Sequence, residues 1–272
     1  MPDFAISNIT LPAHDHCGYF PALADMGFTG LEVAPSRAWP DTWGGLGHAD
    51  VETYRKAAET AGLSVTGLHS LFFDQPALSL FGDPETRKRT GDFLVHLSSL
   101  CRDLGGRVLV FGSPSARRRG PLSEAQAADM AVDFFQDCLD RIRDHRTLLC
   151  LEPLCPTDTD FCNSIASILN LRDRVGRSNM RTQIDARAVT ANGDVTDTAF
   201  DAVRDTLVHV HANARDLGEL TASDGDDNAR IGHQLKRIGY KGFVSLEQRM
   251  IGDDDPLAAV ARSLQVMEKA YR

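Results

Sequence analysis

The most constraining feature of this sequence is a regular alternation of short β-rich segments with helical segments along the whole chain. The expected strands lie near Phe4–Asn8, Gly30–Ala34, Ser64–His69, Arg107–Phe111, Thr147–Glu152, Arg181–Asp185, Leu207–His211 and Phe243–Glu247. Several of these segments are continuously apolar and β-branched, which is typical of strands that are covered on both faces. Eight strands in 272 residues leave about 34 residues for each unit, the length of a strand followed by a helix.

Helical segments fill the spaces between the expected strands. The clearest are Asp50–Gly62, a segment from Ser123 toward Ile142, segments that begin at Asp83–Pro84 and at Pro256, and a shorter one at Phe20–Met26. Ser123 and Gln126 form a capping box, and proline is tolerated in the first turn of a helix. The segment Asp216–Ala229, rich in glycine and aspartate, follows the seventh strand and is expected to be an irregular active-site loop.

The order of these elements predicts the fold. Strands that alternate with helices throughout imply a parallel sheet, and eight such units favour closure into a barrel. The first strand is not followed by a G-x-G-x-x-G turn, which argues against a dinucleotide-binding fold. We therefore expect a single (β/α)8 TIM barrel that comprises residues 1–272 as one domain.

Composition narrows the partners and the location. A formal net charge of −9 argues against a nucleic-acid partner, because phosphate binding needs clustered Lys and Arg. The six cysteines lack Cys-x-x-Cys spacing and are expected to be reduced and buried. The N-terminus does not resemble a secretory signal, and no apolar run is long enough to predict a membrane span. We expect a cytoplasmic protein that acts on a small molecule, and a homodimer or homotetramer is compatible with the sequence.

Polar residues with metal-binding side chains end four successive strands. Glu152 ends the fifth expected strand, Asp185 the sixth, His211 the seventh and Glu247 the eighth. The carboxyl ends of barrel strands meet at one mouth, so we expect these four side chains to lie close together. Three carboxylates in one place repel one another, and a bound cation removes that cost. One imidazole with oxygen ligands suits Mn²⁺, Co²⁺, Mg²⁺ or Zn²⁺, so the sequence predicts one divalent ion without choosing among them.

Each of these residues also has an ordinary structural explanation. Asp185 could cap the following helix, Glu152 could be a solvated carboxylate before a proline, and His211 could be a core histidine. His209 points the same way as His211, because side chains alternate along a strand. The joint placement at four successive strand ends favours the metal site over four independent structural roles.

Seven motifs make the sequence resemble the xylose isomerase-like barrel proteins, a superfamily of sugar isomerases and epimerases that also includes the apurinic endonucleases. The motifs are Gly30–Pro35, Gly67–His69, Val110–Pro114, Leu151–Leu154, Ile184–Asp185, His209–His211 and Gly239–Glu247. They cover essentially the whole chain and are specific for the superfamily rather than for a substrate. In similar ketohexose 3-epimerases, the residues that match Glu152, Asp185, His211 and Glu247 hold one divalent metal. The two matching glutamates act there as acid and base, so the resemblance implies that Glu152 and Glu247 are catalytic.

The implied reaction begins with removal of a proton next to the carbonyl of a sugar, keto-sugar or polyol-derived substrate. A cation bound to the carbonyl stabilises the developing enediolate, while one carboxylate takes the proton and another returns it. Return to the opposite face gives an epimer, and delivery to the adjacent carbon gives an isomer. Two alternatives stay open: a metal-dependent lyase or dehydratase acting on a keto-inositol or a 3-keto-glycoside, and a non-catalytic sugar-binding barrel. The intact ligand set argues against the second.

The sequence departs from the ketohexose epimerases at three places. Ala188 stands where they usually carry a histidine, Asp158 where they carry a glutamate, and Leu217 where they carry an arginine, with Arg215 nearby. These departures weaken the expectation of a free ketohexose substrate and leave the metal ligands unaffected. The loss of a histidine at Ala188 also argues against the three-metal endonucleases.

Five further residues are candidates for contact with the substrate. They are His69 at the end of the third strand, Glu32 on the second, Trp43 after the second, Asp158 after the fifth and Arg215 after the seventh. The run Arg117–Arg119 is interpreted as a solvated loop, with an anion-binding role as the alternative. A phosphorylated substrate is not favoured, because the acidic segment Asp224–Asp227 follows strand seven, near where barrels bind phosphate.

Overall fold

The computed structural model describes residues 1–252 and 255–272 and shows a closed barrel of eight parallel strands in sequence order. The strands are β1 Asp3–Ser7, β2 Gly30–Val33, β3 Ser64–Leu68, β4 Val108–Phe111, β5 Leu148–Leu151, β6 Met180–Asp185, β7 Leu207–Ala212 and β8 Phe243–Leu246. Strand β1 pairs with both β2 and β8, which closes the sheet. The prediction of a (β/α)8 TIM barrel is confirmed.

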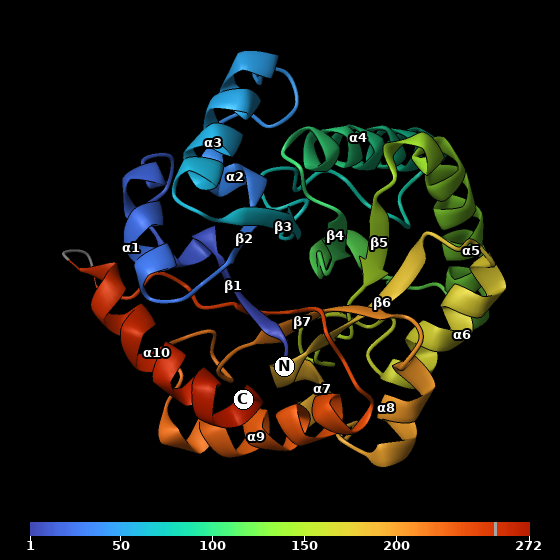
Figure 1. Ribbon diagram of the computed structural model, residues 1–272. Coiled ribbons are helices and arrows are strands. Elements are labelled where there is room, and N and C mark those ends of the chain that lie inside the picture. Colours follow the sequence, from blue (N-terminus) through green and yellow to red (C-terminus); the bar gives the residue numbers. More distant parts are fainter. Residues whose placement is uncertain (253–254) are drawn as a thin grey trace.

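Helices surround the barrel on all sides (Figure 1). They are α1 Phe20–Asp25, α2 Pro35–Ala38, α3 His48–Thr60, α4 Pro84–Asp103, α5 Glu124–Arg141, α6 Ile165–Val175, α7 Ala186–Ala191, α8 Asp197–Val203, α9 Ala222–Arg237 and α10 Pro256–Tyr271. Short 3-10 turns lie at Asn8–Thr10, Cys17–Tyr19, Ser115–Arg117 and Arg143–His145. Among the described residues, no helix combines the length and the apolar character that a bilayer crossing requires.

The predicted capping signals operate at the helix starts. The side chain of Asp83 accepts a hydrogen bond from the backbone N–H of Thr86 at 2.8 Å, which satisfies a free donor at the start of α4. Ser123 and Gln126 form the predicted capping box of α5: the Gln126 side chain accepts from the Ser123 N–H at 3.0 Å. These local bonds explain why both long helices begin where the sequence predicted.

One prediction about a loop was wrong. The segment Asp216–Ala229 is not irregular throughout, because α9 begins at Ala222. Thr221 and Asp224 form a capping box there, in which the carboxylate of Asp224 accepts from the Thr221 N–H at 3.0 Å. Acidic residues favour the start of a helix, so the aspartates that suggested a loop instead support a helix N-terminus.

Alternation along each strand separates the two faces of the barrel. On β4, Leu109 and Phe111 face outward and join the large core, where Phe111 meets Phe135 of α5 with ring centroids 5.4 Å apart. Val108 and Val110 form a separate small cluster with Cys150, inside the barrel. The inward-facing positions continue toward the carboxyl ends of the strands, where the residues become polar.

Candidate metal centre and substrate cavity

The four predicted ligands meet at the carboxyl ends of β5 to β8. One ligand atom from each of Glu152, Asp185, His211 and Glu247 lies within 4.8 Å of every other. Nδ1 of His211 is 3.1 Å from a carboxylate oxygen of Glu152, 3.3 Å from one of Glu247 and 3.9 Å from one of Asp185. The pairing of β6 with β7 sets Asp185 beside His211, so strand register brings two of the ligands together.

Asp185 uses its two carboxylate oxygens differently. Oδ1 accepts from the backbone N–H of Ala188 at 2.7 Å and thereby caps α7. Oδ2 faces the other ligands and accepts a hydrogen bond from the side-chain amide of Asn213. In the sequence, a helix cap and a metal ligand are alternative roles for Asp185. In the structure, one oxygen of the carboxylate caps α7 and leaves the other free to face the cluster.

His211 is held by a carboxylate on the side away from the other ligands. Its Nε2 lies 3.0 Å from Oε1 of Glu32, which is fully buried beneath it. Nε2 of His209 lies 2.9 Å from the same oxygen, and Ser245 donates to the other Glu32 oxygen at 2.7 Å. Glu32 therefore fixes the ring so that Nδ1 points at the acidic cluster, the arrangement found behind many metal-binding histidines.

The two glutamates have separate surroundings. Oε1 of Glu247 is 3.3 Å from Nδ1 of His69, and Oε2 accepts from Asn213 at 2.9 Å. On the other side of His69, Nε2 is 2.5 Å from the hydroxyl of Ser7. These contacts fix the carboxylate of Glu247 beside an imidazole and an amide.

Glu152 rests against groups from its own and neighbouring strands. Gln183, one strand away, donates to Oε1 at 3.2 Å. A Cβ built on Gly112 would lie 2.0 Å from Oε2, so a side chain at that position would occupy the space of the carboxylate. The glycine at the end of β4 is therefore required by the position of Glu152.

The electrostatics of the metal-free cluster are those of crowded carboxylates around one imidazolium. Burial raises the pKa of Asp185, and the neighbouring charges of Glu152 and Glu247 raise it further, to about 8. Burial alone would lower the pKa of His211, but Glu32 and Glu247 hold it well above its usual value. Burial likewise opposes ionisation of Glu247, yet the charges of His211 and His69 keep its pKa well below the usual range.

The residues fit a divalent cation. Three carboxylates and one imidazole offer ligand atoms within 4.8 Å of one another, and the charges of Glu152 and Glu247 raise the pKa of Asp185, a repulsion that a cation would remove. Mn²⁺, Co²⁺, Mg²⁺ and Zn²⁺ all accept such mixed oxygen and nitrogen ligands. A second group of Glu32, His69 and His211 also has ligand atoms within this range, but Nε2 of His211 is already engaged by Glu32 at 3.0 Å.

A cavity of about 770 Å³ opens above the cluster. Five of the predicted site residues line it: Glu152, Asp185, Glu247, His69 and Asp158. Arg215 lines it as well, although its side chain is largely exposed and pairs with Asp227 at 2.9 Å. The volume is sufficient for a small carbohydrate.

Two predicted contacts lie elsewhere. Glu32 and Trp43 are not among the described residues that line the cavity. Glu32 is buried below His211, and Trp43 packs against Phe93 of α4 with ring centroids 4.8 Å apart. The expectation that Trp43 contacts the substrate is not met, because the loop after β2 turns its ring toward α4.

The arginine run is not solvated along its whole length. Arg118 is exposed, but Arg117 is fully buried, and its Nη2 donates to the backbone carbonyl of Glu152 at 2.8 Å. Burial lowers the pKa of Arg117 to about 10. The expectation of a solvated loop was therefore wrong for Arg117, whose short 3-10 turn directs its side chain between β4 and β5.

Sequence reasoning missed three residues that complete the site. Gln183 was detectable, because it stands two residues before Asp185 and therefore faces inward on the same strand. Asn213 follows His211 by the same interval and joins Asp185 to Glu247. Arg187 carried no such signal: it lines the cavity from α7 and pairs with Asp158 at 2.6 Å.

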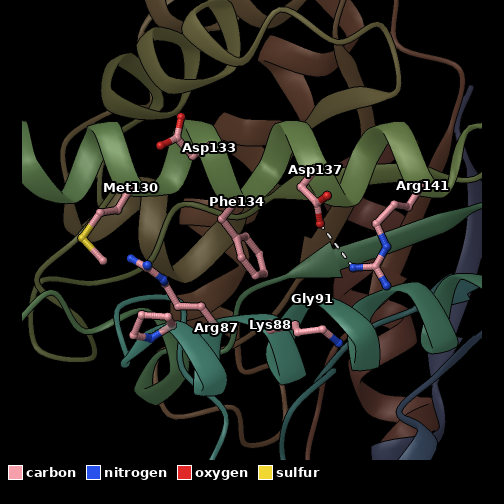
Figure 2. A pocket seen from close by; sticks show the side chains of 9 residues that line it. Arg87, Lys88, Gly91, Met130, Asp133, Phe134, Asp137 and Arg141 are labelled. Carbon is pink, nitrogen blue, oxygen red and sulfur yellow. Dashed lines mark hydrogen bonds and ion pairs between the residues drawn. The ribbon is translucent and has the colours of Figure 1, made fainter.

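A second, smaller cavity of about 300 Å³ lies outside the barrel, between α4 and α5 (Figure 2). Three of its charged side chains are paired: Lys88 lies 2.8 Å from Asp92, and Arg141 lies 3.2 Å from Asp137 and 2.7 Å from Asp92. It is remote from the ends of the strands and lacks a cluster of metal ligands among the described residues. The mouth of the barrel is therefore the candidate functional site.

Solved structures of known proteins share this fold. D-psicose 3-epimerase from Clostridium cellulolyticum H10 superimposes with a TM-score of 0.84 at 16% identity, over 99% of each chain. 3-Keto-D-glucoside 4-epimerase from E. coli gives 0.80 at 19% identity, covering 98% of this chain and 99% of that one. L-ribulose 3-epimerase gives 0.81 at 18% identity, over 99% of this chain and 96% of that one. At such identities these structures establish the shared fold.

Sequence comparison adds the family. None of the curated proteins gives a significant match to this sequence. The sequence model of the xylose isomerase-like TIM barrel family matches residues 20–270, nearly the whole chain. The chain therefore belongs to the xylose isomerase-like TIM barrel family.

Proposed function

We propose that this protein is a divalent-metal-dependent epimerase or isomerase of a sugar, keto-sugar or polyol-derived substrate. The observation that carries the proposal is the convergence of Glu152, Asp185, His211 and Glu247, of which the three carboxylates line the cavity. Similarly folded proteins are named as epimerases of D-psicose, L-ribulose and a 3-keto-glucoside, which supports a carbohydrate substrate.

The site has the parts that the reaction needs. A divalent cation held by the four ligands would polarise a substrate carbonyl and so acidify the neighbouring C–H bond. Glu152 and Glu247 both line the cavity, and they come from β5 and β8 with His211 between them. One carboxylate can therefore accept the α-proton while the other donates a proton on a different side of the same carbon.

The surrounding residues keep the two glutamates available for proton transfer. Gln183 orients Glu152 with a neutral amide, whereas His69 and Asn213 orient Glu247. Asp185 cannot turn freely, because its Oδ1 is engaged by the N-terminus of α7. Asp185 is therefore assigned a ligand role, and proton transfer is assigned to the glutamates.

The test separates metal binding from proton transfer. Glu152→Gln and Glu247→Gln each keep a side-chain oxygen for the cation but lose a usable base. We expect each variant to retain bound metal while kcat falls by about 100-fold or more, the order of a general acid–base contribution. Metal content is measured by elemental analysis. Turnover is measured with a panel of ketoses in D₂O, where NMR follows exchange of the α-proton.

Glu124→Gln, on the exposed start of α5, is the matched control and should behave as wild type. If one glutamate serves each side of the carbon, one variant should still exchange the α-proton without forming product. Wild-type turnover in either active-site variant would leave that glutamate as a ligand only. The mass of the product distinguishes an epimerase or isomerase from a lyase. An epimer or isomer has the mass of the substrate, whereas the product of elimination is lighter by water or an aglycone.

A further inference from the structure

The cavity carries more arginine than the proposed chemistry uses. Four arginines line it: Arg37, Arg187, Arg215 and Arg249. Three of them have acidic partners. Arg187 pairs with Asp158 at 2.6 Å, Arg215 with Asp227 at 2.9 Å, and Arg249 has Asp216 at 3.6 Å. Their charges are therefore largely balanced by the protein.

Arg37 differs from the other three. In the part of the chain that the structure describes, no carboxylate oxygen lies within 4.0 Å of its guanidinium. Its Nη2 donates to the backbone carbonyl of Leu11, which fixes the side chain, but its Nε is buried without a hydrogen-bond partner. A fixed guanidinium with an unused donor and an unbalanced charge lies at the cavity wall.

Two hydroxyl groups of the same cavity are also unused. The Oγ atoms of Ser36 and Ser113 are buried and have no hydrogen-bond partner among the described residues. Ser36 precedes Arg37 on α2, which follows β2, and Ser113 follows β4. The two strands flank β3, so these donors belong to one sector of the mouth, whereas the metal ligands end β5 to β8.

Buried donors without hydrogen-bond partners are uncommon in folded proteins, so three of them at one cavity need an explanation. We propose that this sector, with Arg37 as its charged residue, binds a carboxylate of the substrate, so that the substrate class is acidic sugars such as ketohexuronates. The proposal rests on the proposed function, because it assumes that the carbonyl end of the sugar lies at the metal ligands. One unpaired guanidinium matches the single charge of a carboxylate, and its planar donor edge suits that group.

The experiment compares sugars that differ only in this group. A panel of 2-ketohexoses is matched in stereochemistry with ketohexuronates, in which a carboxylate replaces the terminal hydroxymethyl group, and with the 6-phosphates. Affinities for the Mn²⁺-loaded protein are measured by calorimetry. We expect the best ketohexuronate to bind at least tenfold more tightly than its matching ketohexose.

The variants assign that preference to Arg37. Arg37→Gln should remove the preference while the ketohexose affinity changes less than twofold, and Arg37→Lys should retain part of it. Arg89→Gln, at an exposed position on α4, changes the net charge equally and should bind all ligands as wild type does. If Arg37→Gln lost affinity equally for the acidic and the neutral sugar, the proposal would be overturned and Arg37 would have a structural role.

The remaining outcomes separate this inference from the proposed function. Equal affinity of wild type for acidic and neutral sugars, with turnover of both, overturns the carboxylate subsite and leaves the epimerase. Tighter binding of the phosphates, lost in Arg37→Gln, overturns the assignment to a carboxylate. Arg37-dependent binding of a ketohexuronate without exchange of its α-proton overturns the proposed reaction and supports the subsite. Failure of every sugar to bind overturns both.

Discussion

Single side chains at the mouth of this barrel perform more than one task. Asp185 shows this most clearly, since one oxygen caps α7 and the other faces the metal ligands. The two tasks are compatible because the cap fixes the carboxylate in the orientation that the ligand needs. The cost is a crowded site in which burial and the charges of Glu152 and Glu247 raise the pKa of Asp185 to about 8.

That pKa predicts how metal binding depends on pH. Below pH 8 the metal-free protein carries a proton on Asp185 that the cation must displace, and protonated His211 adds another. The apparent affinity for Mn²⁺ should therefore rise from pH 6 to pH 8, about tenfold per unit for each proton displaced. The same shift means that the contribution of Asp185 to the stability of the metal-free protein is present below pH 3.8 and lost as pH rises through 8.

Calorimetry in buffers of different ionisation enthalpy counts the protons released. Asp185→Asn keeps an oxygen for the cap of α7 but has no carboxylic proton to lose. The number of protons that this variant releases on metal binding should therefore be lower than that of wild type by about one. An unchanged release in this variant would show that Asp185 is already ionised in the metal-free protein.

Glu32 is predicted to act on the metal through His211. Glu32→Gln keeps a hydrogen-bond acceptor near Nε2 but removes the charge that orients the imidazole and increases its basicity. We expect metal affinity to fall by about 10-fold to 100-fold, with kcat partly restored by excess cation. Glu59→Gln, at an exposed position on α3, is the control. Wild-type metal affinity in Glu32→Gln would make Glu32 a partner of His209 alone.

At the scale of elements, the loop after β4 connects to the end of β5 through one buried side chain. Arg117 donates to the carbonyls of Phe111 and Glu152, at 3.5 and 2.8 Å. These carbonyls end β4 and follow β5, where the sheet hydrogen bonding stops. The guanidinium therefore replaces the strand pairing at the position from which the Glu152 side chain projects.

Replacing Arg117 tests this connection. Arg117→Met fills similar space but leaves the two carbonyls without their donor, so the free energy of unfolding should fall by about 1–3 kcal/mol. Metal affinity should fall too, because the backbone of Glu152 loses its anchor. Arg118→Met, at the exposed neighbour, should change stability by less than about 0.5 kcal/mol. Urea unfolding and metal titration measure both effects, and equal stability of the two variants would contradict the connection.

For the whole molecule, the candidate metal site draws its residues from half of the barrel. The four ligands come from β5, β6, β7 and β8 or the residue that directly follows, so a cation would hold four consecutive strands together. Binding to the native state alone should raise stability by about 2.7 kcal/mol at a hundredfold excess over Kd. Thermal unfolding with and without Mn²⁺ measures this, and His211→Ala should not respond at the same concentration. An EDTA-treated wild type that gains no stability from added cation would argue against the site.

The barrel and the cluster of candidate metal ligands could be predicted from the sequence alone. Both depend on local and periodic properties: strands covered on both faces are apolar, capping residues begin helices, and parallel strands bring their carboxyl ends to one mouth. Glu152, Asp185, His211 and Glu247 could be identified because each stands at the same place in its unit. Gln183 precedes Asp185 by two residues, so its position on the inner face could also have been predicted.

The contacts of the loop residues could be learned from the tertiary structure alone. Arg117 and Arg118 are adjacent and chemically identical, yet one is buried and the other exposed, because the path of a loop depends on the elements that it crosses. Trp43 packs on α4 instead of the cavity, and Arg187 reaches Asp158 across 29 residues of sequence. That no carboxylate of the described residues pairs with Arg37 likewise depends on its neighbours in space. Periodicity specifies which face of a strand a residue occupies, but the partners of a loop side chain are set by packing between segments distant in sequence.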